Sequence, residues 1–289
     1  MTIIENEIMA NHTTYRIGGP VKFFCEPETN AELAEAVEWA GKNSVPYRVI
    51  SNGSNILISD SGLDCMIIKI KNFYRDIKIK ENSAYVGGGY ALHQCIEDLA
   101  AQGLGGFEKL AFIPGSIAGA IVMNAGAYGI SIDRFINYVE AFCPKEGIIK
   151  LKHDDLHFGY RQSIFQHRND LIIIGTELNM EKKNQADLAN DIAAIRDKRK
   201  KHPTLPSCGS VFRNPSDGRF AGAVIEELGL KGTTIGEAQI SLQHANFIVN
   251  LGNARANDVY ALINLVKKCA RKQLNIELET EVKLWGDFS

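Results

Sequence analysis

TNAELAEAVEWAGKNSVPYRVISNGSNILISDSGLDCMIIKI, residues 29 to 70, decides the fold class of the chain. Thr29 and Glu32 stand at the spacing of a helix capping box, and Leu33, Ala36, Val37 and Ala40 recur on one helix face. YRVISNGSNILIS then predicts two short strands around the turn SNGSN, and CMIIKI predicts a third. A strand, a glycine turn and a helix follow in 83–104. This succession favours an α/β or α+β sheet over a helix bundle.

Length and charge bound the possible functions. The 289 residues suffice for a sizeable core and for two domains. Lysine and arginine number 32 against 34 acidic residues, so charge gives no reason to expect nucleic acid or an anionic membrane as the main partner. The N-terminal segment lacks a basic signal region, and no apolar run reaches the roughly 18 residues of a membrane helix. We therefore expect a cytoplasmic protein without membrane insertion.

The cysteines are scattered and form no CxxC pair. This pattern predicts reduced, mostly buried thiols and no metal site. Cys208 lies two residues before Ser210 in a glycine-containing turn and could be a nucleophile. A small space-filling residue is the favoured interpretation, because no local signature supplies a base.

Strands are also predicted in 137–143, 148–152 and 171–180, followed by a helix over 186–203. That helix ends in the basic run Arg196 to Lys201. A solvated helix end explains the run better than a nucleic-acid site, because cations are favoured at helix C-termini. We place a domain boundary near residue 200.

The remaining chain predicts a smaller set of elements. These are, in order, a short helix stopped by Gly229, a strand in 244–252, a long amphipathic helix in 257–275 and a final strand in 276–286.

Two glycine-containing loops could hold a phosphate through main-chain N–H groups. They are SNGSN (51–55) and IPGSIAGA (113–120). Neither is a P-loop or a Rossmann fingerprint. The second lies in 106–129, where many glycines and alanines indicate a close approach of the backbone to another group. As a pair, the loops leave open two ordinary glycine turns or one dinucleotide site.

Three polar residues are candidates for chemistry. Ser210 could be a turn residue, a nucleophile or a proton donor, but it has neither a GxSxG elbow nor an SxxK motif. Arg161 could pair with a carboxylate bidentately or be structural. Glu281 alternates with apolar residues, as an outward-facing strand residue does. The residues alone do not choose among these alternatives.

Seven segments together resemble the UDP-N-acetylenolpyruvoylglucosamine reductase family, also called UDP-N-acetylmuramate dehydrogenase. They occur in the order of that family and cover nearly the whole chain: HTTYRIGGP (12–20), SNGSN (51–55), IPGSIAGAIVMNAGAYG (113–129), FGYRQSIF (158–165), CGSVFRNP (208–215), HANFIVN (244–250) and LETEV (278–282).

The resemblance implies an α+β fold with two domains. An FAD-binding domain of the p-cresol methylhydroxylase and vanillyl-alcohol oxidase type would span 1–200, as two α+β subdomains of about 1–70 and 71–200. A C-terminal α+β substrate-binding domain would span 201–289. FAD would bind non-covalently, with its diphosphate at the first loop and its isoalloxazine near the second. The implied cofactor-binding residues are Ser51, Asn52, Gly53, Ser54, Asn55, Ile113, Pro114, Gly115, Ser116, Gly119, Ala120, Asn124, Gly126 and Ala127.

The resemblance also implies a reaction. NADPH would reduce FAD, and the reduced flavin would pass a hydride to the enolpyruvyl double bond, giving UDP-N-acetylmuramate for peptidoglycan synthesis. The family's catalytic residues correspond to Ser210, Arg161 and Glu281. The resemblance implies that Ser210 is the proton donor, that Arg161 binds the substrate carboxylate and that Glu281 is the acidic partner. Residues expected to bind the UDP-sugar are Tyr160, Arg213, Asn214, Gln243 and Asn246, with Lys231 as a further candidate.

Some positions depart from the family pattern. Asn52 stands where the family favours glycine, Arg213 where it favours lysine, and Cys208 where it favours alanine. The segment between Arg161 and Ser210 is too short for the tyrosine-bearing lid of one branch, so the shorter branch is expected. A monomer or weak homo-oligomer is expected.

Two rival functions remain at this point. The first is a flavin-dependent oxidoreductase of the same fold that acts on an alcohol or hydroxy acid. The second is a catalytically silent binding protein.

Overall fold

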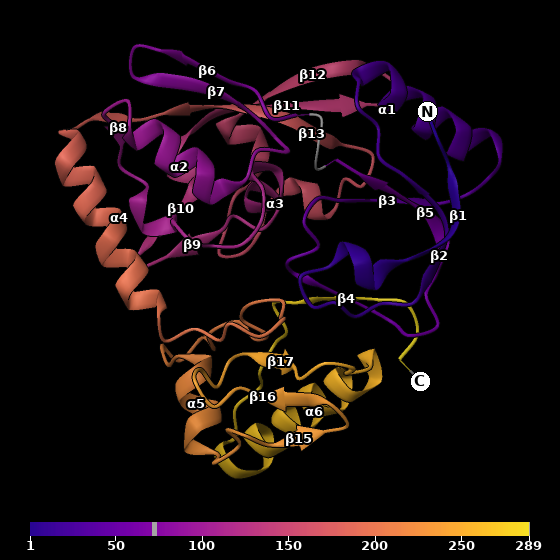
Figure 1. The fold of residues 1–289 in the computed structure, drawn as a ribbon, viewed down its shortest axis with the longest axis vertical. Coiled ribbons are helices and arrows are strands. Elements are labelled where there is room, and N and C mark those ends of the chain that lie inside the picture. The colour runs from indigo at the N-terminus through magenta and orange to yellow at the C-terminus, as the bar shows by residue number, and fades with distance from the viewer. Residues whose placement is uncertain (71–73, 289) are drawn as a thin grey trace. The chain divides into compact units, whose positions relative to one another are not determined.

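The computed structural model describes residues 1–70 and 74–288, and the chain divides into two compact units (Figure 1). Strands β1 (Ile4–Ile8), β2 (Pro20–Cys25) and β5 (Leu63–Lys69) each contain residues of both units. Unit 1 comprises Met1–Ile4, Phe24–Asn52 and Cys65–Arg199, and unit 2 comprises Glu5–Phe23, Gly53–Asp64 and Lys200–Ser289.

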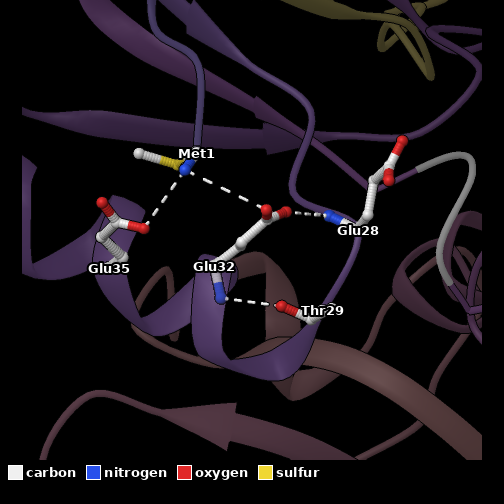
Figure 2. Close-up of polar contacts among 5 residues, drawn as sticks. All are labelled: Met1, Glu28, Thr29, Glu32 and Glu35. Carbon is white, nitrogen blue, oxygen red and sulfur yellow. Dashed lines mark hydrogen bonds and ion pairs between the residues drawn. The ribbon is translucent and has the colours of Figure 1, made fainter.

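Helix α1 (Asn30–Lys42) forms where the sequence predicts it. The Thr29 hydroxyl accepts a hydrogen bond from the Glu32 N–H at 3.1 Å, and the Glu32 carboxylate accepts one from the Glu28 N–H at 2.7 Å (Figure 2). The amine of Met1 lies 3.4 Å from the Glu35 carboxylate and 4.0 Å from that of Glu32. Carboxylates are favoured near helix N-termini, so these contacts stabilise the start of α1.

A five-stranded antiparallel sheet forms the centre of unit 1, with strand order β12-β11-β13-β7-β6. Helix α3 packs on β7 and β13, on the same side of the sheet as α2 (Figure 1). The residue bounds are β6 (Ile77–Lys80), β7 (Ser83–Gly87), β11 (Ile136–Cys143), β12 (Gly147–Lys152), β13 (Ile172–Asn179), α2 (Leu92–Ala100) and α3 (Ile117–Val122).

Unit 1 also contains a parallel pair, in which β3 (Tyr47–Ile50) lies beside the Met66–Lys69 part of β5. Helix α4 packs on α2. The remaining elements of this unit are α4 (Gln185–Arg199), β8 (Leu104–Gly105), β9 (Gly126–Ala127), β10 (Ile130–Ser131), β14 (Glu181–Lys182) and the 3-10 turns Glu108–Leu110, Ile132–Phe135, His153–Leu156 and Ile164–Gln166.

Unit 2 has its own apolar core between helices α5 and α6 and the antiparallel sheet β15-β16-β17. The apolar stripe of α6 supplies Val259, Leu262, Ile263 and Val266 to the core. The element bounds are β4 (Ile56–Ile58), α5 (Ala221–Glu227), β15 (Thr234–Ile235), β16 (Ala238–Ile240), β17 (Ile248–Asn250), α6 (Ala256–Cys269), β18 (Lys283–Trp285) and the 3-10 turn Met9–His12.

The C-terminal segment differs from the sequence prediction. The long helix continues beyond α6 as a π-helical turn over Ala270–Leu274, and Asn275 ends it in the left-handed conformation. The strand predicted over 276–286 is regular only as β18, which pairs parallel with β4. The main-chain groups of the residues before β18 instead form hydrogen bonds with several different segments, so they do not form a continuous strand pairing with any one of them.

The six cysteines are free and all except Cys269 are buried, which confirms the prediction of mostly buried thiols. Within the described ranges, no helix combines the length and apolar character that a bilayer crossing requires.

Candidate active site

The 113–129 stretch of unit 1 is built around the short helix α3. The Ser116 hydroxyl accepts a hydrogen bond from the Gly119 N–H at 3.2 Å, and Gly115 precedes it with a φ of +133°, which favours glycine. Part of the alanine content serves packing, as Ala118 shows. A Cβ at Gly88 would lie 3.2 Å from the Ala118 Cβ, and the Ala118 N–H donates to the Gly88 carbonyl. The predicted close approach of backbone is therefore partly an approach to the protein itself.

The SNGSN loop needs its glycine for a similar reason. Gly53 has a φ of +59°, and a Cβ there would lie 2.5 Å from the His12 carbonyl oxygen and 2.9 Å from the Thr13 Cα. The loop is thus closed on the HTTYRIGGP segment, and no side chain is tolerated at this position.

Both loops present a main-chain donor that the protein does not use. Gly53 and Ser116 are buried. Within residues 1–70 and 74–288, neither N–H donates to an acceptor. Unpaired buried N–H groups are rare in folded proteins, so these two indicate a missing partner. A phosphate oxygen is such a partner, so each loop, taken by itself, fits a phosphate group of a dinucleotide cofactor.

Arg161 of unit 1 is held against the loop that follows α3. Its Nη2 donates to the Gly126 carbonyl at 2.7 Å and its Nη1 to the Asn124 carbonyl at 3.5 Å. The Asn124 side chain donates in turn to the Gly159 carbonyl at 3.0 Å. Arg161 also has a φ of +55°, a conformation that costs a residue with a side chain about 1–3 kcal/mol. The guanidinium is therefore oriented by its surroundings.

Tyr160 stands beside this arginine with 55% of its surface exposed. The Arg161 guanidinium carbon lies 5.2 Å from the centre of the Tyr160 ring, within the range of a cation–π contact.

Ser210 of unit 2 lies at the start of an extended segment that is bonded on both sides. Gly209, with a φ of +78°, turns the chain into it. On one side the Glu281 N–H donates to the Val211 carbonyl at 2.8 Å, and on the other the Val211 N–H donates to the Asn246 carbonyl at 2.8 Å. The structure thus brings Ser210 and Glu281 onto adjacent backbone segments. Arg161 belongs to unit 1.

Asn246 holds the Ser210 segment with its side chain as well. Its Oδ1 accepts from the Phe212 N–H and its Nδ2 donates to the Phe212 carbonyl, each at 2.9 Å. Asn246 is 5% exposed. Both ends of this buried amide bond the main chain, which indicates a positioning role for a residue expected to contact substrate.

Asn55 has a corresponding role on the Glu281 side. Its Nδ2 donates to the Glu281 carbonyl at 3.2 Å, and its own carbonyl accepts from the Lys283 N–H at 3.0 Å. A residue predicted in the first cofactor loop therefore orients the acidic segment.

Cys208 is not placed for nucleophilic chemistry. Burial raises the pKa of its thiol to about 12, and the charge of Glu281 adds to the increase. The thiol is therefore protonated at neutral pH, which agrees with the space-filling interpretation. Its neighbour Tyr15 is also fully buried and donates from its hydroxyl to the Ile248 carbonyl at 2.9 Å.

The sequence did not single out Lys283. Burial lowers the pKa of its ammonium group, and the charge of Arg213 lowers it further, whereas Glu281 raises it. Arg213, Lys283 and Glu281 therefore form a charged group in unit 2. The sequence could have indicated Lys283 through its spacing from Glu281, because residues two positions apart point to the same side of an extended chain.

Three other predicted substrate residues, Asn214, Gln243 and Lys231, have contacts within the protein. The Asn214 Oδ1 accepts from the Ala221 N–H at 3.1 Å, at the start of α5. The Gln243 N–H donates to the Ser241 hydroxyl at 3.1 Å, and Gln243 is exposed. Lys231 forms an ion pair with Glu226 at 2.6 Å.

The basic run at the end of α4 is not uniformly solvated, contrary to the sequence prediction. Arg196 and Lys198 are exposed, but Arg199 is half-buried and its Nη1 donates to the Phe112 carbonyl at 3.4 Å. Every fourth residue returns to the same face of a helix, so Arg199 follows the buried Ile195 toward the interior.

Two regions of the chain match models of known protein domains. Residues 21–152 match the model of an FAD binding domain, and residues 200–285 match the model of the UDP-N-acetylenolpyruvoylglucosamine reductase C-terminal domain. These matches define a flavin-dependent oxidoreductase, and a phosphate group fits each of the two loops. The predicted α+β fold with an FAD-binding and a C-terminal domain is confirmed.

The chain belongs to the UDP-N-acetylenolpyruvoylglucosamine reductase family. It is 41% identical over 287 residues to the enzyme of that name from Anoxybacillus flavithermus, covering 99% of this chain and 95% of the relative. The corresponding enzyme of Alkaliphilus oremlandii is 37% identical, with coverages of 99% and 94%. The crystal structure of UDP-N-acetylenolpyruvylglucosamine reductase (MurB) from Thermus caldophilus superposes with a TM-score of 0.86 at 33% identity, covering 99% of this chain and 98% of that one.

Proposed function

We propose that the protein reduces the enolpyruvyl group of UDP-N-acetylenolpyruvoylglucosamine to UDP-N-acetylmuramate, with NADPH as hydride donor and non-covalent FAD. Family membership and the matched FAD-binding region support this function. The structural observation that carries it is the hydrogen bond from the Glu281 N–H to the Val211 carbonyl, which holds the carboxylate-bearing segment beside the one that Ser210 begins.

We assign cofactor binding to residues 1–200 and substrate binding to 201–289. When bound, FAD supplies two-electron hydride transfer between donor and substrate. The unpaired N–H groups of Gly53 and Ser116 support phosphate binding at their two loops. The residues proposed to surround the cofactor are Ser51, Asn52, Gly53, Ser54, Asn55, Ile113, Pro114, Gly115, Ser116, Gly119, Ala120, Asn124, Gly126 and Ala127.

Ser210, Arg161 and Glu281 are the proposed catalytic residues. Hydride arrival at the terminal carbon of the enolpyruvyl group leaves negative charge on the neighbouring carbon and its carboxylate. The planar guanidinium of Arg161 binds that carboxylate with two parallel hydrogen bonds. Glu281 hydrogen-bonds the carboxyl group or orients the arginine, and the Ser210 hydroxyl gives the neighbouring carbon the proton that completes the D-lactyl ether.

The UDP-sugar is proposed to contact Tyr160, Arg213, Asn214 and Gln243. For Asn246 we propose that the contact is indirect, because its amide bonds the Phe212 main chain. Lys283 adds a positive charge beside Arg213, which suits a diphosphate.

We propose that the enzyme works in the cytoplasm and supplies a precursor for cell-wall synthesis, and thereby for cell shape and division. The scattered free cysteines and balanced charge support a reducing compartment and partners other than nucleic acid or membrane. A monomer or weak homo-oligomer is proposed.

Anaerobic flavin spectroscopy tests the function directly. NADPH should bleach the flavin absorbance of the purified protein, and UDP-N-acetylenolpyruvoylglucosamine should restore it. If the substrate fails while an aldehyde or keto acid succeeds, the protein is a different flavin oxidoreductase. A colourless protein that takes up no FAD would indicate a binding protein.

Gly126→Ala should impair the enzyme by displacing Arg161. The added Cβ would lie 3.1 Å from the Arg161 Nη1 and 2.8 Å from the Ile130 carbonyl oxygen, which is closer than ordinary contact. A displacement of about 1 Å at a substrate-binding group can lower kcat/KM about 100-fold. Steady-state kinetics on the UDP-sugar measure this, with Gly41→Ala as the control, because nothing lies within 4 Å of a Cβ at Gly41. Unchanged kinetics in Gly126→Ala would exclude this crowding.

Asn246→Ala should lower both stability and activity. It leaves the buried N–H and carbonyl of Phe212 without partners, at a cost of about 1–3 kcal/mol for each unsatisfied group. The freed segment carries Ser210, so flavin reoxidation by substrate should slow while reduction by NADPH is retained. Thermal unfolding and stopped-flow absorbance measure the two effects. Gln243→Ala, at an exposed position nearby, should leave thermal stability unchanged.

A further inference from the structure

Unit 1 contains a group of cationic and aromatic side chains that the proposed chemistry does not use. They come from α2, from the residues flanking α3 and from the last turns of α4. The His93 ring centre lies 4.0 Å from that of Phe112, and the Arg196 guanidinium 5.3 Å from it. The Tyr128 ring lies 5.3 Å from the Lys198 ammonium and 5.9 Å from the Arg199 guanidinium.

Arg199 differs from Arg196 and His93 of this group because, among the described residues, no carboxylate forms an ion pair with it. Arg196 forms an ion pair with Glu97 at 3.6 Å, and His93 lies 3.4 Å from the same carboxylate. In the part of the chain that the structure describes, no acidic side chain forms an ion pair with Arg199, and its buried Nε has no acceptor. Its Nη1 bond to the Phe112 carbonyl, at 3.4 Å, is long.

A half-buried guanidinium without a counter-ion destabilises the protein that carries it. Burial lowers the pKa of Arg199, which reports the same unfavourable desolvation. Cations are favoured at a helix C-terminus, but an exposed orientation like that of Arg196 would satisfy that preference without burial. An anion bound at the Arg199 guanidinium would offset this desolvation and would explain the inward orientation of the side chain.

The position of Arg199 indicates which anion. Phe112, whose carbonyl it contacts, directly precedes the loop that ends at the unpaired Ser116 N–H. Phe112 has a φ of +62°, an unfavourable conformation for an aromatic residue, so the loop is held in a particular shape. Arg199 thus contacts the segment that leads to an unused main-chain donor, and guanidinium and main-chain N–H groups both bind phosphate.

We propose that Arg199 is a phosphate-binding residue of the dinucleotide site, contacting either the diphosphate of FAD or a phosphate of NADPH. This inference rests on the proposed function and adds to it a residue outside the motifs of the sequence. Its planar guanidinium offers a phosphate two parallel hydrogen bonds, which lysine at the same position would not reproduce.

Arg199→Gln tests the proposal with two separate measurements on the full-length holoenzyme. The dissociation constant of FAD is obtained from flavin fluorescence on dilution. The apparent affinity for NADPH and for NADH is obtained from anaerobic flavin reduction. Loss of a charge-assisted bond to phosphate should weaken one of these ligands about 10- to 100-fold. A weaker affinity for FAD would show that Arg199 contacts the diphosphate of the cofactor. A weaker affinity for NADPH would show that it contacts the hydride donor. If the affinity for NADH is then unchanged, the contacted group is the 2′-phosphate of NADPH.

Arg168→Gln is the matched control, because it also removes one arginine of unit 1, but one that is exposed and paired with Asp170. It should change neither affinity. Arg199→Lys should recover only part of the affinity lost in Arg199→Gln. It also provides the test if the glutamine variant does not fold.

Unchanged FAD and NADPH affinities in Arg199→Gln would overturn the proposal, and so would an effect confined to reoxidation by the UDP-sugar. A drop in thermal stability with both affinities kept would assign Arg199 a structural role instead. Failure of the proposed function is distinguishable, because the unsubstituted protein would then fail to reoxidise its flavin with UDP-N-acetylenolpyruvoylglucosamine, whereas the Arg199 variants are judged by their affinities for FAD and NADPH.

Discussion

Ser210→Ala should slow reoxidation of the flavin by UDP-N-acetylenolpyruvoylglucosamine by about 10²- to 10⁴-fold, the usual contribution of a positioned proton donor. Reduction of the flavin by NADPH should keep its rate, because that half-reaction needs no proton from the serine. Stopped-flow absorbance under anaerobic conditions follows the two halves separately. The backbone of the segment is held by Glu281 and Asn246 rather than by the hydroxyl, so the variant should fold normally.

Ser216→Ala provides the control for this prediction. Ser216 is an exposed residue of the same loop region, and removing its hydroxyl should change neither half-reaction. Equal slowing of both halves in Ser210→Ala would contradict proton donation, because it would indicate a disturbed cofactor. Activity that a thiol restores in Ser210→Cys would support it, since a thiol also carries a transferable proton.

The regular elements could be predicted because their signals are local. Thr29 and Glu32 are three residues apart and mark the start of α1, and the apolar stripe of α6 is visible within four turns. The strands flanking SNGSN are likewise bounded by nearby turn residues. Short elements such as α3 could not be predicted, because six apolar and small residues are too few to show a helical periodicity.

The contacts that position the site could not be predicted, because they join residues distant in the sequence. Asn55 bonds the Glu281 carbonyl across 226 positions, and Asn246 bonds Phe212 across 34. A side-chain amide can bind a ligand or a main chain equally well, so its sequence context does not say which. Resemblance marked both residues as functional, and the structure indicates that they act on backbone.

Arg199 shows a second limit of sequence reasoning. Six residues from Arg196 to Lys201 include five cations, a pattern typical of a solvated helix end. Helical geometry nevertheless turns one residue of such a run toward the interior, and α4 ends at that residue. Charge runs on amphipathic helices therefore need to be examined residue by residue.

Arg161→Ala should lower kcat/KM for the UDP-sugar at least about 100-fold, and Arg161→Lys should restore little of it. The bond to the substrate carboxylate needs a planar group with two parallel N–H donors, and an ammonium is a point charge without that geometry. The bonds to the Gly126 and Asn124 carbonyls orient the guanidinium before substrate binds, and a lysine would lose this orientation too. Steady-state kinetics on both variants measure the loss.

The control for Arg161 is Arg168→Lys, an exposed arginine in the same unit whose partner is Asp170. It should retain full activity, because exposed ion pairs contribute little. Full activity in Arg161→Lys would show that charge alone suffices and would exclude a bidentate clamp. If instead NADPH reduces the flavin slowly in Arg161→Ala, then the arginine acts on the cofactor through Gly126, since its guanidinium bonds the carbonyl of that residue, which is one of those proposed to surround the cofactor. Comparing the two half-reactions therefore separates binding of the substrate carboxylate from support of the loop.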